Sequence, residues 1–283
     1  MHGSEPYCVI CAIGDLNLDV VVLPAAPLAV DGDTPATIRL SAGGQAANVA
    51  AWASALGGRG RLVCARGTDA GARIAAAQLE RLGVEIRGPV LDGHGGVVVS
   101  TREPDGGRTM ATDHGVAGEL APEMVDRDWI TSADVLHVSG YSLLRRPAVD
   151  AVIAAARMAR RVTLDLASAP DIERFGAARF AELARALGPE LVFANEAERA
   201  ALPALDVNWV IKLGADGAIF PEGHFRAETV SSDDVVDATG AGDALAAGYL
   251  VGGPQLAMAA AARCVAIIGA LPADAGFLPP GRG

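Results

Sequence analysis

The sequence contains few basic residues, and among them is a single lysine, Lys212. Lysine and arginine together number 23 against 34 aspartates and glutamates, so the formal net charge is −11. A protein that binds nucleic acid needs a basic face to meet the phosphate backbone. The charge balance therefore argues against a nucleic-acid partner, although local groups can still bind a small anionic substrate.

Long uninterrupted apolar runs are also missing, even though 51% of the residues are hydrophobic. The longest runs, such as residues 256–262, are much shorter than the roughly 20 residues that span a bilayer. The first residues, MHGSEPYCVICAIGD, contain no basic stretch of the kind that opens a secretory signal. We therefore expect a soluble, cytoplasmic protein without a membrane partner.

Cysteine is sparse as well, with four residues in 283. Cys8 and Cys11 form a CxxC pair inside YCVICAI, an apolar run typical of a strand. A spacing of three places the two side chains on opposite faces of a strand. No second CxxC pair or histidine cluster completes a zinc site. The sequence therefore predicts buried, unreactive thiols.

Two kinds of segment alternate along the chain. Short runs of β-forming residues end in Gly, Ser or Asn, and most are separated by segments rich in Ala, Leu and Arg with helical periodicity. This alternation predicts an α/β fold, a mostly parallel sheet with helices on both faces and a ligand site beyond the carboxyl ends of its strands. The strand-like runs are YCVICAIG, RLVCARG, DVLHVSG, RVTLDLAS, ELVFAN and NWVIKLG, and the helical segments are residues 48–56, 72–82, 147–160 and 174–187.

Two segments break this alternation. Residues 18–40 contain DVVVLP and TPATIRL, and residues 93–113 contain GGVVVSTREPDGGRTMATD. Each is typical of two short strands joined by turn-forming residues, which predicts a small β-strand lid over the site mouth. No internal repeat or long linker divides the chain, so we expect residues 1–283 to form a single domain.

The stretch VVDATGAGDALAAGYL, residues 235–250, places small residues before an acid at the start of a helix. Gly240 and Gly242 adopt positive φ at little cost, and Ala241 is too small to cover the backbone. Their N–H groups would form an anion site with the positive end of the helix dipole. In a kinase, Asp243 would accept a proton from the attacking hydroxyl while these groups stabilise the phosphoryl group. The pattern alone fits a simple helix cap at Asp243 equally well.

A second pair of glycines precedes another helix in SAGGQAANVAAWASALGG, and an amide two residues from an acid occurs upstream in GDLNLDVVV. The spacing of two places that amide and acid on one face of a strand. Asn and Asp suit sugar hydroxyls because both accept hydrogen bonds and Asn also donates. The Asn48 amide either hydrogen-bonds a ligand or caps the helix as a hydrogen-bonded polar group near its start. The residues of this second group are Asn17, Asp19, Gly43, Gly44, Gln45 and Asn48.

With these motifs in this order, the sequence resembles the ribokinase-like (PfkB-type) carbohydrate kinase family. GGQAANVAAWASALG, followed by Gly67, is similar to the N-terminal signature of that family, and DATGAGDALAAGYL is similar to its C-terminal signature. NEAE at residues 195–198 matches its N-x-x-E motif, and IKLGADGAIF resembles its nucleotide-side strand and turn. The resemblance extends over about residues 7–270.

The resemblance implies an ATP- and Mg²⁺-dependent transfer of phosphate to an alcohol group of a sugar, with Asp243 as the base. It also implies that a monovalent cation such as K⁺ can activate the enzyme and that the lid strands can form a homodimer interface. The anion hole would consist of Gly240, Ala241 and Gly242. The sugar would contact Asn17, Asp19, Gly43, Gly44, Gln45 and Asn48. The nucleotide would lie beside Asn195, Lys212, Gly214, Gly217 and Thr239, and Mg²⁺ would be held through water by Asn195 and Glu198.

The identity of the substrate stays open. Gln45 stands where ribokinases commonly have lysine, so ribose specificity is not implied. A nucleoside kinase of the adenosine or pseudouridine type is one alternative, but such enzymes stack the base on aromatic side chains and the two lid segments contain no Phe, Tyr or Trp. A sugar-acid or phosphosugar kinase is another, because Arg108 in the lid could bind a carboxylate or phosphate. A solvated strand arginine fits Arg108 equally well.

Other classes of protein have less support. A P-loop enzyme needs a Gly-Lys pair, and the only lysine follows an isoleucine. A catalytically silent sugar or nucleotide sensor would have lost the base or the metal motif, and both are present. From the residues alone, Lys212 could equally be a paired strand lysine, and Asn195 and Glu198 a strand-end turn and an exposed helix acid.

Overall fold

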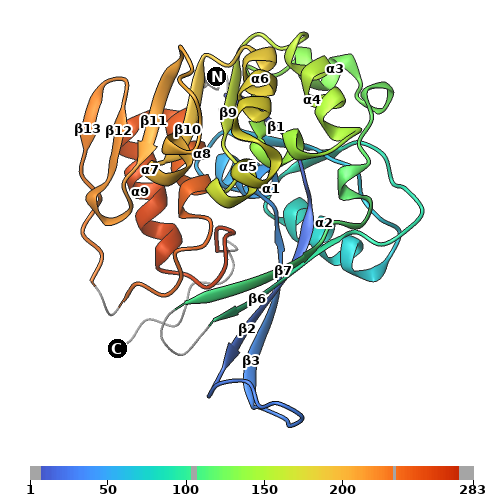
Figure 1. Ribbon diagram of the computed structural model, residues 1–283, viewed down its shortest axis with the longest axis vertical. Coiled ribbons are helices and arrows are strands. Elements are labelled where there is room, and N and C mark those ends of the chain that lie inside the picture. Colours follow the sequence, from blue (N-terminus) through green and yellow to red (C-terminus); the bar gives the residue numbers. More distant parts are fainter. Residues whose placement is uncertain (1–7, 103–106, 232–233, 274–283) are drawn as a thin grey trace, which may run out of the picture.

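A nine-stranded sheet forms the centre of the computed structural model, which describes residues 8–102, 107–231 and 234–273 (Figure 1). All of its strands run parallel except two short antiparallel strands, β12 and β13, at one edge. The order across the sheet is β13-β12-β11-β10-β9-β8-β1-β4-β5. The strands are β1 (Val9–Ile13), β4 (Arg59–Val63), β5 (Glu85–Arg87), β8 (Val135–Ser139), β9 (Val162–Asp165), β10 (Leu191–Asn195), β11 (Asn208–Lys212), β12 (Ala218–Phe220) and β13 (Gly223–Phe225).

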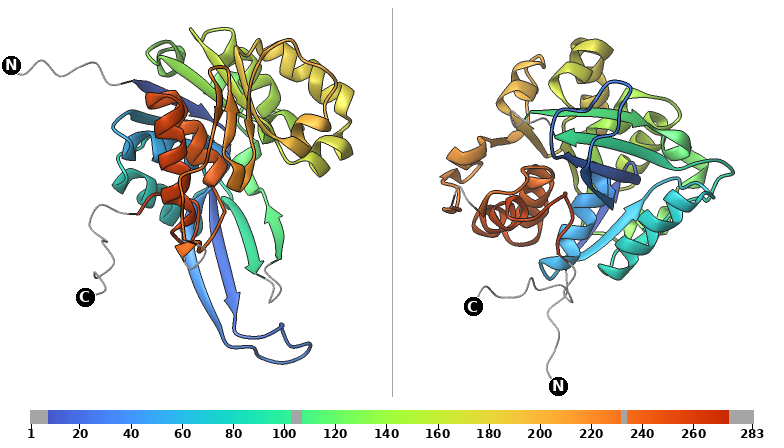
Figure 2. Two further views of the ribbon diagram at one scale, coloured as in Figure 1. Left: turned by 90° about the vertical axis from the view of Figure 1, so that its left-hand side faces the viewer. Right: turned by 90° about the horizontal axis from the view of Figure 1, so that it is seen from below.

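Helices cover both faces of this sheet (Figure 2). Alternate residues of β10 belong to different core clusters: Val192 packs with α4 and α6, whereas Phe193 packs with α1, α8 and α9. The predicted helix over 174–187 is two helices, because Gly176 adopts φ 102° between them. The helices are α1 (Gln45–Ala55), α2 (Ala70–Arg81), α3 (Arg127–Thr131), α4 (Ala148–Ala156), α5 (Ala169–Phe175), α6 (Ala177–Leu187), α7 (Glu196–Ala200), α8 (Ala241–Gly252) and α9 (Pro254–Val265).

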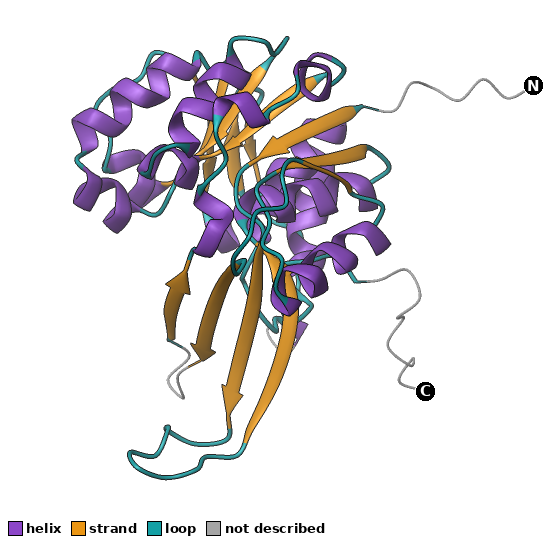
Figure 3. Cartoon of the chain, turned by 90° about the vertical axis from the view of Figure 1, so that its right-hand side faces the viewer, coloured by secondary structure: helices purple, strands orange, loops and turns teal. Residues whose placement is uncertain are grey.

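A second sheet of four strands extends away from the main body (Figures 1 and 3). Its strands are β2 (Asn17–Pro24), β3 (Ala36–Gly43), β6 (Gly96–Arg102) and β7 (Arg108–Asp113), in the order β3-β2-β6-β7. β2 pairs antiparallel with β3 and parallel with β6, which joins the two segments that the sequence predicted as strand pairs. The predicted mostly parallel α/β architecture with a small additional sheet is therefore confirmed.

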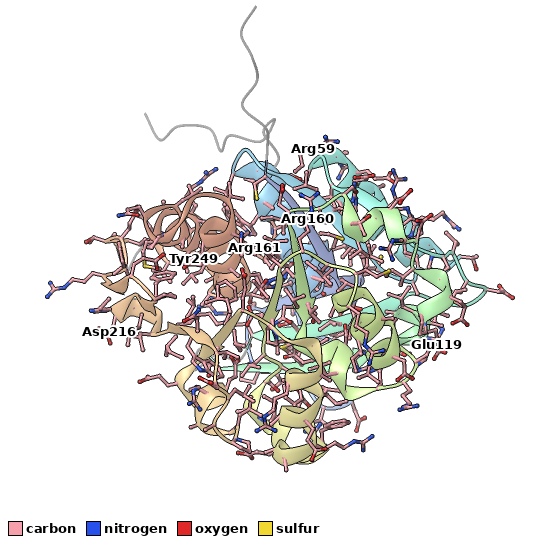
Figure 4. The ribbon with its side chains drawn as sticks, turned by 90° about the horizontal axis from the view of Figure 1, so that it is seen from above. Arg59, Glu119, Arg160, Arg161, Asp216 and Tyr249 are labelled. Atoms are coloured by element: carbon pink, nitrogen blue, oxygen red, sulfur yellow. The ribbon has the colours of Figure 1, made fainter. Side chains whose placement is uncertain are left out.

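The strands of the central sheet begin at the end of the molecule that faces away from the second sheet (Figure 4). Arg59 is the first residue of β4 and Arg161 precedes the first residue of β9, and both are labelled in this view. Arg161 forms an ion pair with Glu190, which precedes β10, at 2.6 Å. The strands therefore end toward the second sheet, where a ligand site is expected in an open parallel sheet.

The three cysteines that follow Cys8 are buried, and burial raises the pKa of the Cys11 thiol to about 12. None of the cysteines in the described ranges forms a disulfide, and no group of three or more His, Cys, Asp or Glu side chains there could hold a metal. The burial and raised pKa of Cys11, Cys64 and Cys264 fit the prediction of buried, unreactive thiols, whereas Cys8 is only partly buried. Within the same ranges, no helix is long and apolar enough to span a membrane.

Helix α1 lies close against β4 because Gly60 has no side chain. A Cβ atom at Gly60 would lie 1.9 Å from the carbonyl oxygen of Ala50 in α1. Two heavy atoms cannot approach so closely, so any larger residue would push α1 away from the sheet. The position of α1 matters for function because this helix carries Asn48.

We expect Gly60→Ala to destabilise the fold by about 1–3 kcal/mol, the usual cost of overpacking a core. The matched control is Gly32→Ala in the exposed loop between β2 and β3, where the nearest contact would be the Ala29 side chain at 3.1 Å. Urea denaturation of both variants measures the difference. Equal midpoints for the two variants would show that α1 does not depend on this close approach.

Candidate active site

Polar residues from several strands gather where the central sheet meets the second sheet. Asp165, Asn195 and Lys212 are the last residues of the neighbouring strands β9, β10 and β11, and Asn17 is the first residue of β2. Because parallel strands end at the same edge of a sheet, these four side chains come from one end of the molecule.

Asp243 lies in the first turn of α8, directly after a turn of small residues. Gly240 precedes the helix in the left-handed region with φ 78°, and no side chain caps the helix start. The Asp243 carboxylate instead accepts a hydrogen bond from the side-chain amide of Asn48 in α1, with 2.7 Å between Nδ2 and Oδ2. The side chain is therefore not a helix cap, and it faces the region between the two helix starts.

Burial, followed by the negative charge of Asp165, raises the pKa of Asp243 from its ordinary value to about 7. The hydrogen bond from Asn48 and the positive charge of Lys212 act in the opposite direction, and the charge of Asp19 adds to the increase. A carboxylate with a pKa near neutrality is suited to accept and return a proton at physiological pH.

The loop before α8 is held by Asp237. One carboxylate oxygen of Asp237 accepts hydrogen bonds from the backbone N–H of Thr239 at 2.9 Å and from its hydroxyl at 2.6 Å. The other accepts from the backbone N–H of Gly269 at 3.1 Å. Thr239 was predicted to lie near the nucleotide phosphates, and in the structure its hydroxyl donates within this loop. Asp237 thus fixes the turn that leads into Gly240.

Lys212 forms an ion pair with Asp165, with 2.7 Å between Nζ and Oδ1. Asp165 is fully buried, and its Oδ2 atom has no hydrogen-bond partner among the described residues. Although burial lowers the pKa of Lys212, the charges of Asp165 and Glu198 raise it above its ordinary value, so the ammonium stays protonated. The same ammonium lies 3.2 Å from where a Cβ of Gly242 would be. The lone lysine therefore lies beside both an acid and the glycine turn.

A cavity of about 630 Å³ opens next to Lys212. Gly214, Gly217 and Gly242 line it, and its remaining walls come from apolar side chains of α8 and α9 and from the loop between β13 and α8. Gly214 and Gly217 both have positive φ, and a Cβ at Gly217 would lie 2.0 Å from the Phe225 carbonyl oxygen. The volume lies within the range of small-ligand and cofactor sites. Three of the residues predicted to lie beside the nucleotide thus line the same cavity, namely Lys212, Gly214 and Gly217.

Asn195 and Glu198 form a capping box at the start of α7. The Asn195 side chain accepts from the Glu198 N–H at 2.8 Å, and Glu198 accepts from the backbone and side-chain nitrogens of Asn195 at 2.8 and 2.7 Å. Burial raises the pKa of Glu198, while the charge of Lys212 lowers it. Carboxylate oxygens engaged in this way keep free lone pairs for water, so the pair fits a hydrated Mg²⁺ better than a direct ligand set.

The predicted sugar residues at the base of the second sheet are packed without spare space. A Cβ at Gly43 would lie 2.1 Å from an Asp19 carboxylate oxygen, and one at Gly44 would lie 2.4 Å from the Asp15 carbonyl oxygen. Asn17 is buried, and its Oδ1 atom has no hydrogen-bond partner among the described residues. Gly43 thus lets β3 lie against the Asp19 carboxylate of β2, and Gly44 lets the start of α1 lie against the backbone of Asp15.

Gln45 connects the start of α1 to two strand ends. Its side-chain nitrogen donates to the carbonyl oxygen of Leu166 at 3.0 Å, and its side-chain oxygen accepts from the Gly140 N–H at 3.2 Å. Asn48 donates through Nδ2 to Asp243, but its Oδ1 atom is buried and has no hydrogen-bond partner among the described residues. Both amides therefore have protein partners at the site, a feature that sequence reasoning did not predict.

The arginines of the second sheet have different positions. Arg102 in β6 donates to the carbonyl oxygen of Val236 at 3.1 Å, so this sheet touches the loop that leads into Gly240. The backbone of Arg108 pairs with that of Arg102. The side chain of Arg108, which was predicted as a candidate substrate contact, lies outside the described part of the structure.

Sequence reasoning missed Asp165 and Asp237. Asp165 ends the strand RVTLDLAS, and Asp237 opens the motif DATGAGD, so both were visible as acids at the ends of quoted motifs. Nothing in the local sequence, however, indicates that Asp165 reaches Lys212, which is 47 residues away.

Comparison with known proteins extends these observations. The family model for pfkB family carbohydrate kinases matches residues 9–269. An ATP-dependent ribose-1-phosphate kinase from Halopiger xanaduensis is 30% identical over 256 residues, which cover 85% of this chain and 83% of that protein.

Solved structures show the same fold. The crystal structure of adenosine kinase from Sinorhizobium meliloti is 26% identical with a TM-score of 0.81, and the match covers 95% of this chain and 97% of that one. A putative ribokinase II from E. coli, solved in complex with ATP and Mg²⁺, is 20% identical with a TM-score of 0.77 over 93% and 94% of the two chains. The family match over nearly the whole length shows that this chain belongs to the pfkB family of carbohydrate kinases, phosphotransferases with an alcohol group as acceptor.

Proposed function

We propose that the protein transfers the γ-phosphoryl group of ATP directly to an alcohol group of a carbohydrate, with Asp243 as the general base. The observation that carries this proposal is the position of Asp243: it is held by Asn48 at the start of α8, directly after the glycine turn, and its pKa is raised to about 7. The base removes the proton of the substrate hydroxyl as that oxygen attacks phosphorus.

The turn of Gly240, Ala241 and Gly242 would receive the negative charge that develops on the transferring group. Its N–H groups lie at the positive end of the α8 dipole, and the Lys212 ammonium lies beside Gly242. Asp165 holds this ammonium by the 2.7 Å ion pair. Positioning and electrostatics therefore supply the catalysis, and no phosphoenzyme is needed.

The nucleotide would occupy the cavity beside Lys212, Gly214 and Gly217. The apolar side chains of α8 and α9 there offer a surface for the adenine ring of ATP. Thr239 and Asn195 would lie on its phosphate side. Asn195 and Glu198 would hold Mg²⁺ through water, and the ion would neutralise phosphate charge. A monovalent cation such as K⁺ is proposed only as an activator.

The sugar would bind between the base of the second sheet and the starts of α1 and α8. The hydrogen bond of Arg102 to the loop before Gly240 supports a role for the second sheet as a lid that excludes water. We also propose that these lid strands pair two copies of the chain, because Ile38, Leu40 and Met110 on them are exposed apolar residues. We propose that the protein acts in the cytoplasm. The proposed sugar contacts are Asn17, Asp19, Gly43, Gly44, Gln45, Asn48 and Arg108.

A nucleoside is the second candidate acceptor. The similarity to an adenosine kinase structure supports it. The lid segments 18–40 and 93–113, however, contain no Phe, Tyr or Trp to stack on a base. Trp52 is buried in the core, and its indole N–H donates to the Ala270 carbonyl oxygen at 2.8 Å. A sugar without a base therefore suits the site better. A silent sensor has no support, because Asp243, Asn195 and Glu198 are all retained.

We expect Asp243→Asn to reduce kcat by at least about a hundredfold, because the amide cannot accept the hydroxyl proton. The exposed acid Asp128 in α3 provides the matched control, Asp128→Asn. Coupled ADP release with Mg²⁺ATP would be measured on ribose, fructose, 2-keto-3-deoxygluconate, fructose 6-phosphate, adenosine and pseudouridine. Turnover of the folded Asp243→Asn variant near that of the wild type would refute the assignment of the base.

We expect the two halves of the Asp165–Lys212 ion pair to shift the pH dependence of kcat/KM in opposite directions. In the wild type, kcat/KM rises with pH through about 7 as Asp243 loses its proton. Asp165→Asn removes a negative charge and lowers the pKa of Asp243, so the rise moves to lower pH. Lys212→Met removes a positive charge and moves it to higher pH, each by about one pH unit.

Steady-state kinetics between pH 5 and 9 would measure both shifts. The charged groups that act on Asp243 come from β9, β11 and β2, namely Asp165, Lys212 and Asp19. A purely structural role for the ion pair would lower activity in both variants at every pH. Shifts in the same direction would contradict this electrostatic coupling.

A further inference from the structure

Arg145 is a partly buried cation without a carboxylate partner. It follows the 3₁₀ turn η3 (Gly140–Leu144) after β8, and its Nη2 atom lies 2.7 Å from Nε2 of His114. No carboxylate in the described part of the chain lies within 4.0 Å of its guanidinium. The neighbouring Arg146, by contrast, is 76% exposed and pairs with Asp150 at 3.3 Å. An arginine held away from water normally has an anionic partner.

The contact with Arg145 fixes the protonation of His114. A guanidinium can only donate, so Nε2 of the imidazole accepts and Nδ1 carries the proton. Burial, followed by the charge of Arg145, lowers the pKa of His114, which keeps the ring neutral. Nδ1 is buried and has no hydrogen-bond partner among the described residues, with the Asp15 carboxylate 4.0 Å away. The pair therefore presents hydrogen-bond donors that no acceptor within the described ranges uses.

These donors lie beside the proposed sugar residues. Nδ1 of His114 lies 4.0 Å from the Asp15 carboxylate, and a Cβ at Gly44 would lie 2.4 Å from the Asp15 carbonyl oxygen. The His114 backbone also lies near Asn17, because a Cβ at Gly96 would lie 2.0 Å from the Asn17 side-chain oxygen and 3.4 Å from the His114 carbonyl oxygen.

The pair and the proposed base come from different elements. Arg145 follows η3 and His114 follows β7, whereas Asp243 lies in the first turn of α8. Because a guanidinium suits an anion and Asp243 would act on a hydroxyl, the two would contact different groups of the substrate.

The charge around the sugar residues explains why a guanidinium there implies an anion. Asp15 and Asp19 already supply negative charge, and a neutral sugar needs only hydroxyl partners. Arg145 is only partly buried, and Asp15, the carboxylate whose pKa its charge lowers, forms no ion pair with it among the described residues, so guanidinium N–H groups are left for a ligand. A phosphate or a carboxylate satisfies two guanidinium N–H groups at once, which is the geometry in which arginine binds most strongly.

We propose that Arg145 and His114 form an anion subsite of the acceptor pocket, which binds a phosphate or carboxylate carried by the sugar at a position remote from the attacking hydroxyl. The subsite rests on the proposed function, since it needs a sugar bound at Asn17. The name of the Halopiger relative, a ribose-1-phosphate kinase, fits an acceptor of this class.

The test compares ribose 1-phosphate and 2-keto-3-deoxygluconate with neutral ribose in the full-length protein. Affinity is measured by calorimetry without ATP, so the result does not depend on whether Asp243 is the base. We expect the wild type to bind one of the two anionic sugars at least tenfold more tightly than ribose. Arg145→Met should reduce that preference by about tenfold to a hundredfold, whereas the matched control Arg146→Met should leave it unchanged.

Two further variants separate recognition from packing. Arg145→Lys keeps the charge but loses the planar fork, so an intermediate preference is expected. His114→Phe removes the donor at Nδ1 and should also reduce the preference. If Arg145→Met weakens the binding of ribose 1-phosphate, the subsite binds phosphate. If it weakens the binding of 2-keto-3-deoxygluconate, the subsite binds carboxylate. Equal loss of affinity for ribose and both anions, or a wild type without preference, would overturn the proposal.

Discussion

The hydrogen bond from Asn48 to Asp243 is the contact on which the geometry of the site depends. It joins the first turns of α1 and α8, which lie far apart in the sequence and each follow a glycine at positive φ, Gly44 and Gly240. One turn further along α1, Trp52 is buried and donates to the Ala270 carbonyl oxygen, and Ala270 in turn packs against Gly240. The proposed base Asp243, its amide partner and the glycine turn are therefore parts of one packed unit, so a shift of α1 would displace all three.

The chain has one lysine, and it lies where the site needs a positive charge. Asp165, Glu198 and Asp243 all raise the pKa of Lys212, and the ion pair with Asp165 fixes its position. The Asp165 charge also raises the pKa of Asp243 toward neutrality. Asp165 thus has two effects: it holds the Lys212 ammonium near the glycine turn, and it raises the pKa of Asp243.

Sequence reasoning predicted the fold and named most residues of the candidate site because these features depend on short-range patterns. Apolar strands alternating with helices predict the sheet, and small residues before Gln45 and Asp243 predict two helix starts at its carboxyl edge. The interpretations that the sequence left open depended on contacts between distant residues. The choice between a cap and a free carboxylate at Asp243 needed Asn48, 195 residues away, and the role of Lys212 needed Asp165.

The same limit explains why Arg145 was overlooked. Arg145 and Arg146 are adjacent in sequence, and nothing local distinguishes them. Only the fold shows that one is exposed beside Asp150 while the other turns inward toward His114.

The strands of the second sheet begin or end beside the residues of the proposed anion subsite. Asn17 begins β2, Gly96 begins β6 and His114 follows β7, and in register Asn17 lies opposite both Gly43 and Gly96. A side chain at Gly96 would collide with Asn17, so the two strands can meet at the pocket floor only through a glycine. A movement of this sheet therefore displaces Asn17 and the backbone of His114 together. If the second sheet acts as the proposed lid, an anion held by Arg145 and His114 would bias its position, which would couple recognition of the charged group to exclusion of water from the reacting end.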